Sequence, residues 1–199
     1  EGRRYARVTS IIQADELAGE RFDPNSPWIT PSTNIGTSVD EFVRDFFAGE
    51  FTGEDGRLSN DYLYDYPNAT QAEWRAFANQ LVGLKNYLDA QGLTVIPRDV
   101  TVTGTVKVTD AQGQVHEVPV AGTLDLLAYD AQGNFHIFDM KTNRSGISEE
   151  KRKKYAKQVS MYQKFIEDKY GIKVASLNII PINVTYPAPV GFRDGKTKY

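Results

Sequence analysis

The chain has 199 residues, of which 40% are hydrophobic and 25% charged, a composition typical of one soluble globular domain with a single core. It contains no cysteine, which excludes disulfides, thiolate zinc sites and iron–sulfur clusters, so any bound metal must use oxygen or imidazole ligands. The formal net charge of −3 argues against a protein that coats nucleic acid through bulk positive charge.

No stretch of the sequence approaches the roughly 18 consecutive apolar residues of a membrane-spanning helix. The chain starts Glu-Gly-Arg-Arg, and this positive charge is not followed by the apolar segment of a signal peptide. We therefore expect a cytoplasmic protein with no membrane partner. Because residue 1 is not methionine, we also expect that the chain can be a piece of a longer one.

The charge is distributed unevenly along the chain. Residues 1–140 carry ten Lys and Arg against twenty-one Asp and Glu, a balance of about −11, whereas residues 141–173 carry ten against four, about +6. The second segment is therefore a basic island in an acidic chain.

The first half of the chain predicts two helices separated by loops. Residues 23–34 are rich in Pro, Ser and Asn and predict a loop, after which Thr37 and Ser38 are candidate caps of a short amphipathic helix. Residues 49–69 predict a long loop, and a second helix is expected over about 70–90. The apolar residues of both helices have helical spacing: Val39, Phe42, Val43, Phe46 and Phe47, then Trp74, Phe77, Leu81, Leu84 and Leu88.

The second half predicts strands followed by a helix. Over residues 94–140 the β-branched residues alternate, with turn signals at Asp110–Gly113 and Asp130–Gly133, which predicts an antiparallel meander of three or four strands. Ser148 is the expected cap of a long helix over about 149–170.

The end of the chain completes the expected architecture. Residues 174–185 predict a further strand, and the tail over 186–199 is expected to be loose. The order of helices, strands, helix and strand predicts one α+β (α/β) domain over residues 1–199, with its core at about 36–185. We expect a central mixed sheet of about four to five strands flanked by helices.

Three charged residues stand out in the predicted strands. Asp125 shares a strand face with Thr123 and Leu127 in an otherwise apolar run, where a carboxylate is costly. Asp139 and Lys141 share a face of the next strand, and the short turn between the strands can bring Asp125 beside Asp139. Two carboxylates that converge in a half-buried place repel each other unless a cation, such as a magnesium-like ion, neutralises them.

This combination of side chains suits the hydrolysis of a phosphodiester. A metal held by the acids lowers the pKa of a bound water, while the ammonium of Lys141 can hold the attacking water and counter the charge of the transition state. Spacing alone leaves an alternative, in which Asp139 and Lys141 form an ion pair at a strand end and Asp125 is a solvated residue near a turn.

Three segments carry a family resemblance: Gly122-Thr-Leu-Asp125, then Ile137-Phe-Asp139-Met-Lys141-Thr142, then Gln158-Val-Ser-Met-Tyr162. Their order and spacing resemble the successive motifs of the PD-(D/E)xK nuclease superfamily, over about residues 36–185. In particular they resemble its RecB-type branch, found in recombination helicase-nucleases, CRISPR-associated exonucleases and phage exonucleases, in which a Gln-x-x-x-Tyr motif follows the lysine on a helix.

The resemblance implies a restriction-endonuclease-like core and a role for each matching residue. Asp125 and Asp139 would be ligands of Mg²⁺ or Mn²⁺, and Lys141 would be the catalytic lysine. Gln158 and Tyr162 would support the active site or contact nucleic acid. Read singly, Gln158 is instead a helix-surface glutamine and Tyr162 a core aromatic residue.

Asp40 is a further candidate ligand, upstream of the strands. The RecB-type branch has a helix that opens Gly-x-x-x-His, with the histidine as a metal ligand, and Gly36-Thr-Ser-Val-Asp40 resembles this frame with Asp in place of His. On a helical wheel Asp40 lies closer to the apolar stripe than Glu41 does. The alternative is that both acids belong to a helix cap, with Asp40 pairing with Arg44 four residues later.

The basic segment offers contacts to nucleic acid. Arg144, Lys151 and Lys154 are candidate phosphate contacts, because cationic side chains supply most sequence-independent affinity for nucleic acid. A solvated helix face is an equally good interpretation of these cations. His116 and His136 lack zinc-ligand spacing, and His136 alternates away from the acids.

Taken together, these patterns favour a magnesium- or manganese-dependent DNA nuclease. The resemblance implies DNA as the substrate, an exonuclease-type activity in repair, recombination or phage DNA metabolism, and a helicase or another replication or recombination protein as a partner. A catalytically inactive nucleic-acid-binding module of the same fold is the alternative, and a purely structural domain in which the acids and the lysine make ion pairs is a third.

Overall fold

The computed structural model describes residues 5–16, 29–51, 71–110, 112–143, 146–183, 192–193 and 196–197. Its helices and strands are, in chain order, β1 (Ala6–Arg7), α1 (Val8–Glu16), α2 (Ile29–Ala48), α4 (Gln71–Ala90), β2 (Thr94–Ile96), β3 (Val100–Thr109), β4 (Val115–Leu124), β5 (Leu126–Tyr129), β6 (Phe135–Asn143), α5 (Glu149–Tyr170), β7 (Val174–Asn183), β8 (Phe192–Arg193) and β9 (Lys196–Thr197).

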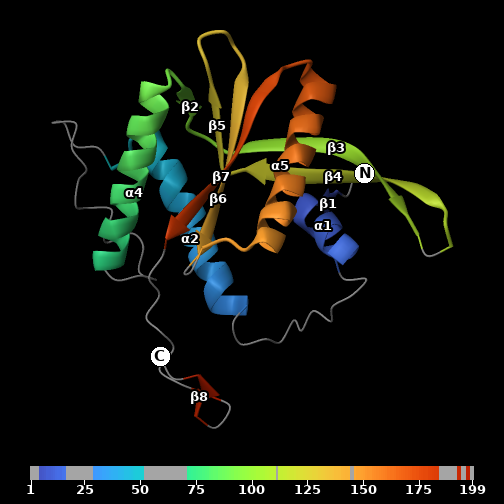
Figure 1. Ribbon diagram of the computed structural model, residues 1–199, viewed down its shortest axis with the longest axis horizontal. Coiled ribbons are helices and arrows are strands. Elements are labelled where there is room, and N and C mark those ends of the chain that lie inside the picture. The colour runs from blue at the N-terminus through green and yellow to red at the C-terminus, as the bar shows by residue number, and fades with distance from the viewer. Residues whose placement is uncertain are drawn as a thin grey trace.

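Two mixed sheets form the body of the molecule (Figure 1). The first has the strand order β2-β5-β6-β7, in which β6 and β7 are parallel and the other neighbours are antiparallel. The second has the order β1-β4-β3, with β1 parallel and β3 antiparallel to β4. Helices α2 and α4 lie on one side of the four-stranded sheet, and α1 and α5 lie on the other. The predicted α+β class, with mixed sheets flanked by helices, is confirmed.

Strand β6 contributes to a separate core on each side of the sheet, because its side chains alternate. Phe138 and Met140 are buried in the core that includes α2 and α4. Ile137 is buried in the other core, with Tyr162 and other apolar residues of α5. Asp139 follows Ile137 by two residues and therefore lies on the α5 side of the sheet.

The chain bends at Asp125, and this bend separates the two sheets. Strand β4 ends at Leu124 and β5 begins at Leu126, so the single strand expected over 123–129 is two strands in two sheets. The expectation of one continuous meander is wrong in this respect, because alternation along a strand does not reveal a change of partner strand. Asp125 lies at the corner between the sheets and not within a strand face.

Helix α2 is longer than the sequence predicts. It begins at Ile29, inside the segment 23–34, for which the sequence predicts a loop. Thr37 and Ser38 lie within the helix and are not its caps. Pro31 is compatible with this start, because the amide that proline lacks has no helical partner in the first turn.

The later helices follow the sequence closely. The helix predicted over about 70–90 corresponds to α4. Helix α5 begins after Ser148, as predicted, and the hydroxyl oxygen of Ser148 accepts a hydrogen bond of 3.3 Å from the amide of Lys151. Helix α5 ends at Gly171, which has a φ of 63°. In the described part of the chain, no helix is both long and apolar enough to cross a membrane.

The two hairpin turns share the chemistry that their common sequence predicts. In each turn the side chain of Asp110 or Asp130 accepts hydrogen bonds of 2.8–2.9 Å from the amides two and four residues later. Gly113 and Gly133 have φ of 81° and 79°, a left-handed conformation that favours glycine. Most of the predicted loop over 49–69 lies outside the described residues, as does most of the tail, in which β8 and β9 pair with each other.

Two glycines in the β3–β4 hairpin lie directly under aromatic rings of α5. A Cβ on Gly122 would lie 2.5 Å from Cε1 of Tyr162, and a Cβ on Gly104 would overlap the ring of Phe165. Both rings are buried. The absence of side chains at these positions therefore sets how closely α5 approaches the hairpin.

Gly104→Ala should lower the free energy of unfolding by about 1–3 kcal/mol, because the added methyl group forces the Phe165 ring or the strand to move. Gly83→Ala is a matched control. Gly83 is an exposed residue within α4 with nothing within 4 Å of an added Cβ, and this variant should gain about 0.5–1 kcal/mol from helix propensity. Urea denaturation measures both, and an unchanged stability of Gly104→Ala would refute the packing constraint.

Candidate active site

Asp125 and Asp139 lie side by side where β5 begins. The antiparallel ladder pairs Leu126 with Phe138, so Asp125, one residue earlier, lies level with Asp139. The amide of Met140 donates a hydrogen bond of 2.7 Å to Oδ2 of Asp125. This bond fixes the corner of the chain against β6, so that the carboxylate of Asp125 at the corner lies beside that of Asp139 on β6.

Asp139 is buried, and Lys141 is its partner. The Nζ of Lys141 lies 3.0 Å from Oδ1 and 2.9 Å from Oδ2 of Asp139. Only the Oδ1 contact has hydrogen-bond geometry, and within the described residues Oδ2 has no hydrogen-bond partner although it is buried. A buried carboxylate oxygen that keeps an unused lone pair is suited to bind a cation.

Helix α5 closes the site on the other side. Nε2 of Gln158 donates a hydrogen bond of 2.9 Å to the hydroxyl oxygen of Tyr162, and both side chains are buried. Nζ of Lys141 also lies 5.0 Å from the centre of the Tyr155 ring. The structure thus brings Gln158 and Tyr162 to the same side of the sheet as the acids.

Asp40 approaches the acids from α2. A pocket of about 190 Å³ is lined by Asp40 and Asp125, together with residues that include Arg98 and Thr123. Strand β2 pairs only with residues 127–129 of β5 and stops short of Asp125, which leaves this edge open toward α2. Asp40 lies well inside α2, which begins eleven residues earlier, so the interpretation of Asp40 as part of a helix cap is wrong.

Arg44 does not take the partner that its spacing suggests. Its Nη1 lies 3.2 Å from both carboxylate oxygens of Asp99, and its Nε lies 3.5 Å from Oδ1 of Asp45. The guanidinium therefore bridges α2 to the segment before β3, across the pocket. Asp40, which the helix-cap alternative paired with Arg44, lines the same pocket as Asp125.

The pKa values of the acids reflect this crowding. Burial and then the charge of Asp125 raise the pKa of Asp139 to about 7, although Lys141 lowers it. Asp40 is exposed as a residue, but the protein atoms around its carboxylate and then the charge of Asp125 raise its pKa to about 7. The pKa of Asp125 is also raised, chiefly by burial. Burial alone would lower the pKa of Lys141, but the charges of Asp139 and Asp125 outweigh it and raise that pKa.

These residues fit a magnesium-like ion that is completed by water and substrate. Among the residues that the structure describes, no three His, Cys, Asp or Glu side chains converge as a preformed metal site. Magnesium needs no such cage, because it commonly binds one or two carboxylates and keeps several waters. Asp125 and Asp139 supply such a pair, with Oδ2 of Asp139, which lies 2.9 Å from the Lys141 ammonium but has no hydrogen-bond partner among the described residues, as one donor.

The predicted phosphate contacts lie near the start of α5. Lys151 is exposed in its first turn, and Lys154 is half-buried one turn later. Arg144 lies outside the described residues. Further cations at 152, 153 and 157 are exposed on the same helix, so this end of α5 is strongly basic.

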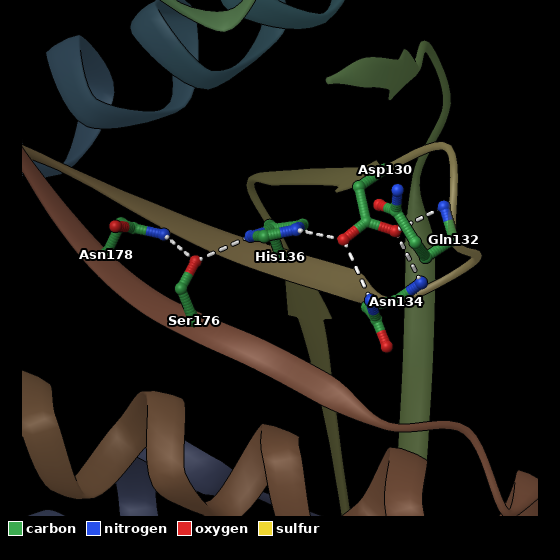
Figure 2. A network of polar contacts seen from close by, with 6 residues as sticks. All are labelled: Asp130, Gln132, Asn134, His136, Ser176 and Asn178. Atoms are coloured by element: carbon green, nitrogen blue, oxygen red, sulfur yellow. Dashed lines mark hydrogen bonds and ion pairs between the residues drawn. The ribbon is translucent and has the colours of Figure 1, made fainter. Parts of the chain in front are cut away.

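His136 belongs to a separate polar network near the opposite end of β6 (Figure 2). Its Nδ1 lies 2.8 Å from Oγ of Ser176, and its Nε2 lies 3.4 Å from Oδ2 of Asp130. Asn178 donates to the same Ser176 oxygen at 2.8 Å, and Asn134 donates to Asp130. The network links the β5–β6 turn to β7, which gives His136 a structural role.

The comparisons with known proteins identify the family. The sequence matches the family described as the PD-(D/E)XK nuclease superfamily over residues 20–189, and the chain belongs to it. Members of this superfamily are generally hydrolytic nucleases, and they typically use divalent metals. No curated protein matches the sequence significantly.

One solved structure, described as the crystal structure of SSO0001, is similar at 14% sequence identity with a TM-score of 0.31. The match covers 88% of this chain and 70% of that one.

Two features of the site are not apparent from the sequence. Tyr155 has the spacing of a core residue, and no local signal places its ring over Lys141. The i+4 spacing of Asp40 and Arg44 suggests an ion pair, whereas Asp99, 55 residues from Arg44, is the actual partner. Both contacts depend on how the helices pack on the sheets.

Asp139→Asn tests the raised pKa through stability. Because the native carboxylate has a pKa of about 7 against an ordinary value of 3.8, the native state binds more protons between these pH values, and stability falls as the pH rises through this window. The variant lacks this loss. In the presence of chelator, the free energy of unfolding of Asp139→Asn relative to that of the wild type should therefore rise by about 1–4 kcal/mol from pH 5 to pH 8.

Urea unfolding at both pH values provides the measurement. Asp168→Asn, which removes an exposed carboxylate paired with Lys164, is the control and should show no such change with pH. A difference between Asp139→Asn and wild type that is constant from pH 5 to pH 8 would rule out the raised pKa.

Proposed function

We propose that this chain is a divalent-metal-dependent nuclease that hydrolyses DNA phosphodiester bonds, with Asp125 and Asp139 as metal ligands and Lys141 as the catalytic lysine. The observation that carries the proposal is the buried carboxylate of Asp139, which shares a strand end with Lys141, faces Asp125 and keeps one oxygen without a hydrogen bond. A purely structural ion pair has no need of the second acid.

The two acids would hold Mg²⁺ or Mn²⁺ through carboxylate oxygens. When bound, such an ion neutralises phosphate oxygens and lowers the pKa of a bound water. In the reaction the water oxygen forms a bond to phosphorus and loses a proton to solvent, while the bond to the leaving oxygen breaks and that oxygen takes up a proton from solvent, which yields one terminal phosphate and one hydroxyl group. Asp40 would be a further ligand from the α2 side, because it lines the same pocket as Asp125.

Lys141 would act as an ammonium. Its pKa is raised, so it carries a positive charge at neutral pH and cannot accept the proton of the attacking water. We infer that it donates a hydrogen bond to that water or to a phosphate oxygen and stabilises the negative charge that develops in the transition state. Gln158 and Tyr162 would support the acids from α5.

Within the PD-(D/E)XK superfamily, we propose that the chain belongs to the RecB-type branch. This assignment is supported by Gln158 and Tyr162, which follow the lysine on a helix and are hydrogen-bonded to each other beside the acids. We accordingly propose an exonuclease-type activity in DNA repair, recombination or phage DNA metabolism. A helicase or another replication or recombination protein is the proposed partner.

Lys141→Ala and Asp139→Asn should each reduce the cleavage rate by about 10²-fold or more, because each removes a group that stabilises the transition state. Cleavage is measured on linear and circular, single- and double-stranded DNA, with magnesium, manganese or chelator. The proposed exonuclease should require an end and therefore leave circular substrates intact. Lys173→Ala and Asp168→Asn are the matched controls, since both residues are exposed and neither belongs to the proposed site, and both variants should cleave normally.

Metal-induced stabilisation provides a readout that does not depend on cleavage. Manganese should raise the melting temperature of the wild type more than that of Asp139→Asn. If DNA stays intact under every condition and the protein binds DNA without metal, the proposed nuclease activity is refuted. The alternative, a catalytically inactive nucleic-acid-binding module, would then be supported.

The double variant Lys151→Ala, Lys154→Ala should weaken DNA binding about equally for all sequences, because these side chains are proposed to contact phosphates. The slope of log K against log salt should fall by about 1–2. Fluorescence anisotropy over a range of salt concentrations measures this slope. Lys164→Ala, which removes a cation paired with Asp168 at 2.6 Å further along α5, should leave it unchanged, and equal slopes for all proteins would exclude the proposed contacts.

A further inference from the structure

We propose that Tyr155 is a positioning residue for Lys141, whose ring holds the ammonium beside the scissile phosphate when the metal occupies Asp139. This inference rests on the proposed function and adds a specific residue to it. Tyr155 lies on α5, three residues before Gln158, outside the motifs that suggested the site.

The Lys141 ammonium has two kinds of contact in the structure. On one side it is 3.0 Å from Oδ1 and 2.9 Å from Oδ2 of Asp139. On the other it lies 5.0 Å from the centre of the Tyr155 ring, within the roughly 6 Å range of a cation–π interaction. The Lys141 side chain is only 20% exposed, so water screens neither contact fully.

Metal binding changes these two contacts differently. The oxygens of Asp139 that hold the ammonium are also the donors proposed for the metal, and a divalent cation on Asp139 both withdraws its charge and repels Lys141. The face of the Tyr155 ring is not a ligand for a hard cation and remains available to the ammonium. The ring is therefore the contact that persists in the metal-bound state in which the reaction occurs.

The position of Tyr155 on its helix makes the contact a fixed one. Helix α5 is held at a close distance by the Tyr162 ring over Gly122 and by the Phe165 ring over Gly104. Tyr155 precedes Tyr162 by two turns on the same side of α5, so the same packing fixes its distance from β6. Holding a long, flexible lysine side chain in one place costs substantial rotamer entropy. A contact with a fixed ring helps to offset this cost.

The first test compares Tyr155→Phe with Tyr155→Leu and Tyr155→Met. The phenylalanine variant keeps the aromatic face and should retain a kcat close to that of wild type. The two aliphatic variants keep the apolar helix stripe but lose the ring, and their kcat should fall by about 3- to 30-fold with little change in KM. Melting temperatures establish that each variant is folded. Equal kcat values for the Phe, Leu and Met variants would overturn the proposal.

A double-mutant cycle separates positioning of Lys141 from general packing. If Tyr155 acts through Lys141, Tyr155→Leu should cause no further loss of kcat in a Lys141→Ala background. The same fold-loss in both backgrounds would show that the ring only supports the fold, and would reject the proposal.

The contact can also be observed without any reaction. In protein with ¹³C-labelled lysine, the ε-methylene resonance of Lys141, identified by its loss in Lys141→Ala, should be shifted upfield by the ring in wild type and Tyr155→Phe but not in Tyr155→Leu. Magnesium should leave this shift in place, and its disappearance with magnesium would refute the proposal. If wild type cleaves no substrate, the proposed function fails; if it cleaves and Tyr155→Leu is equally fast, only the role of Tyr155 fails.

Discussion

The site depends on one costly interaction, the burial of the Asp139 carboxylate against the Lys141 ammonium at the end of β6. A lysine neutralises one buried acid, but Asp125, at the corner before β5, lies level with Asp139 and adds a second charge. Burial raises the pKa of both acids, and the charge of Asp125 raises that of Asp139 further. An apolar pair of residues would avoid this electrostatic cost, and the proposed cation accounts for an arrangement that keeps it.

The rest of the architecture keeps this charge in place. The bend at Asp125 moves the chain from one sheet to the other and turns its carboxylate toward β6, where the Met140 amide holds it. On the opposite side, aromatic rings of α5 lie over Gly104 and Gly122, which allows the helix to approach closely enough for its polar residues to reach the site. Two glycines that carry no functional group thus set the distance between α5 and the acids.

The parts of the fold that the sequence predicts are those with local causes. Ser148 determines the start of α5, and the aspartates at 110 and 130 form their turns through their own neighbouring amides. The alternation of β6 correctly places Asp139 and Lys141 on the side away from Phe138. The division into two sheets and the start of α2 at Ile29 depend instead on partners distant in sequence. The same is true of the Tyr155 contact, for which helical spacing indicates only burial.

Asp40 shows how one substitution in a motif alters the electrostatics of a whole site. With Asp40, Asp125 and Asp139 ionised and Lys141 protonated, the proposed site has a net charge of about −2, which a divalent cation neutralises completely. A neutral histidine in place of Asp40 would leave about −1. The additional acid increases the attraction for a divalent ion, but it also raises the cost of the metal-free state, as the pKa of about 7 for Asp40 shows. The charge of Arg44 offsets part of that cost, but the guanidinium is engaged by Asp99, because its Nη1 is hydrogen-bonded to both carboxylate oxygens of that residue. In the proposed site, Asp99 therefore keeps Asp40 available for the metal.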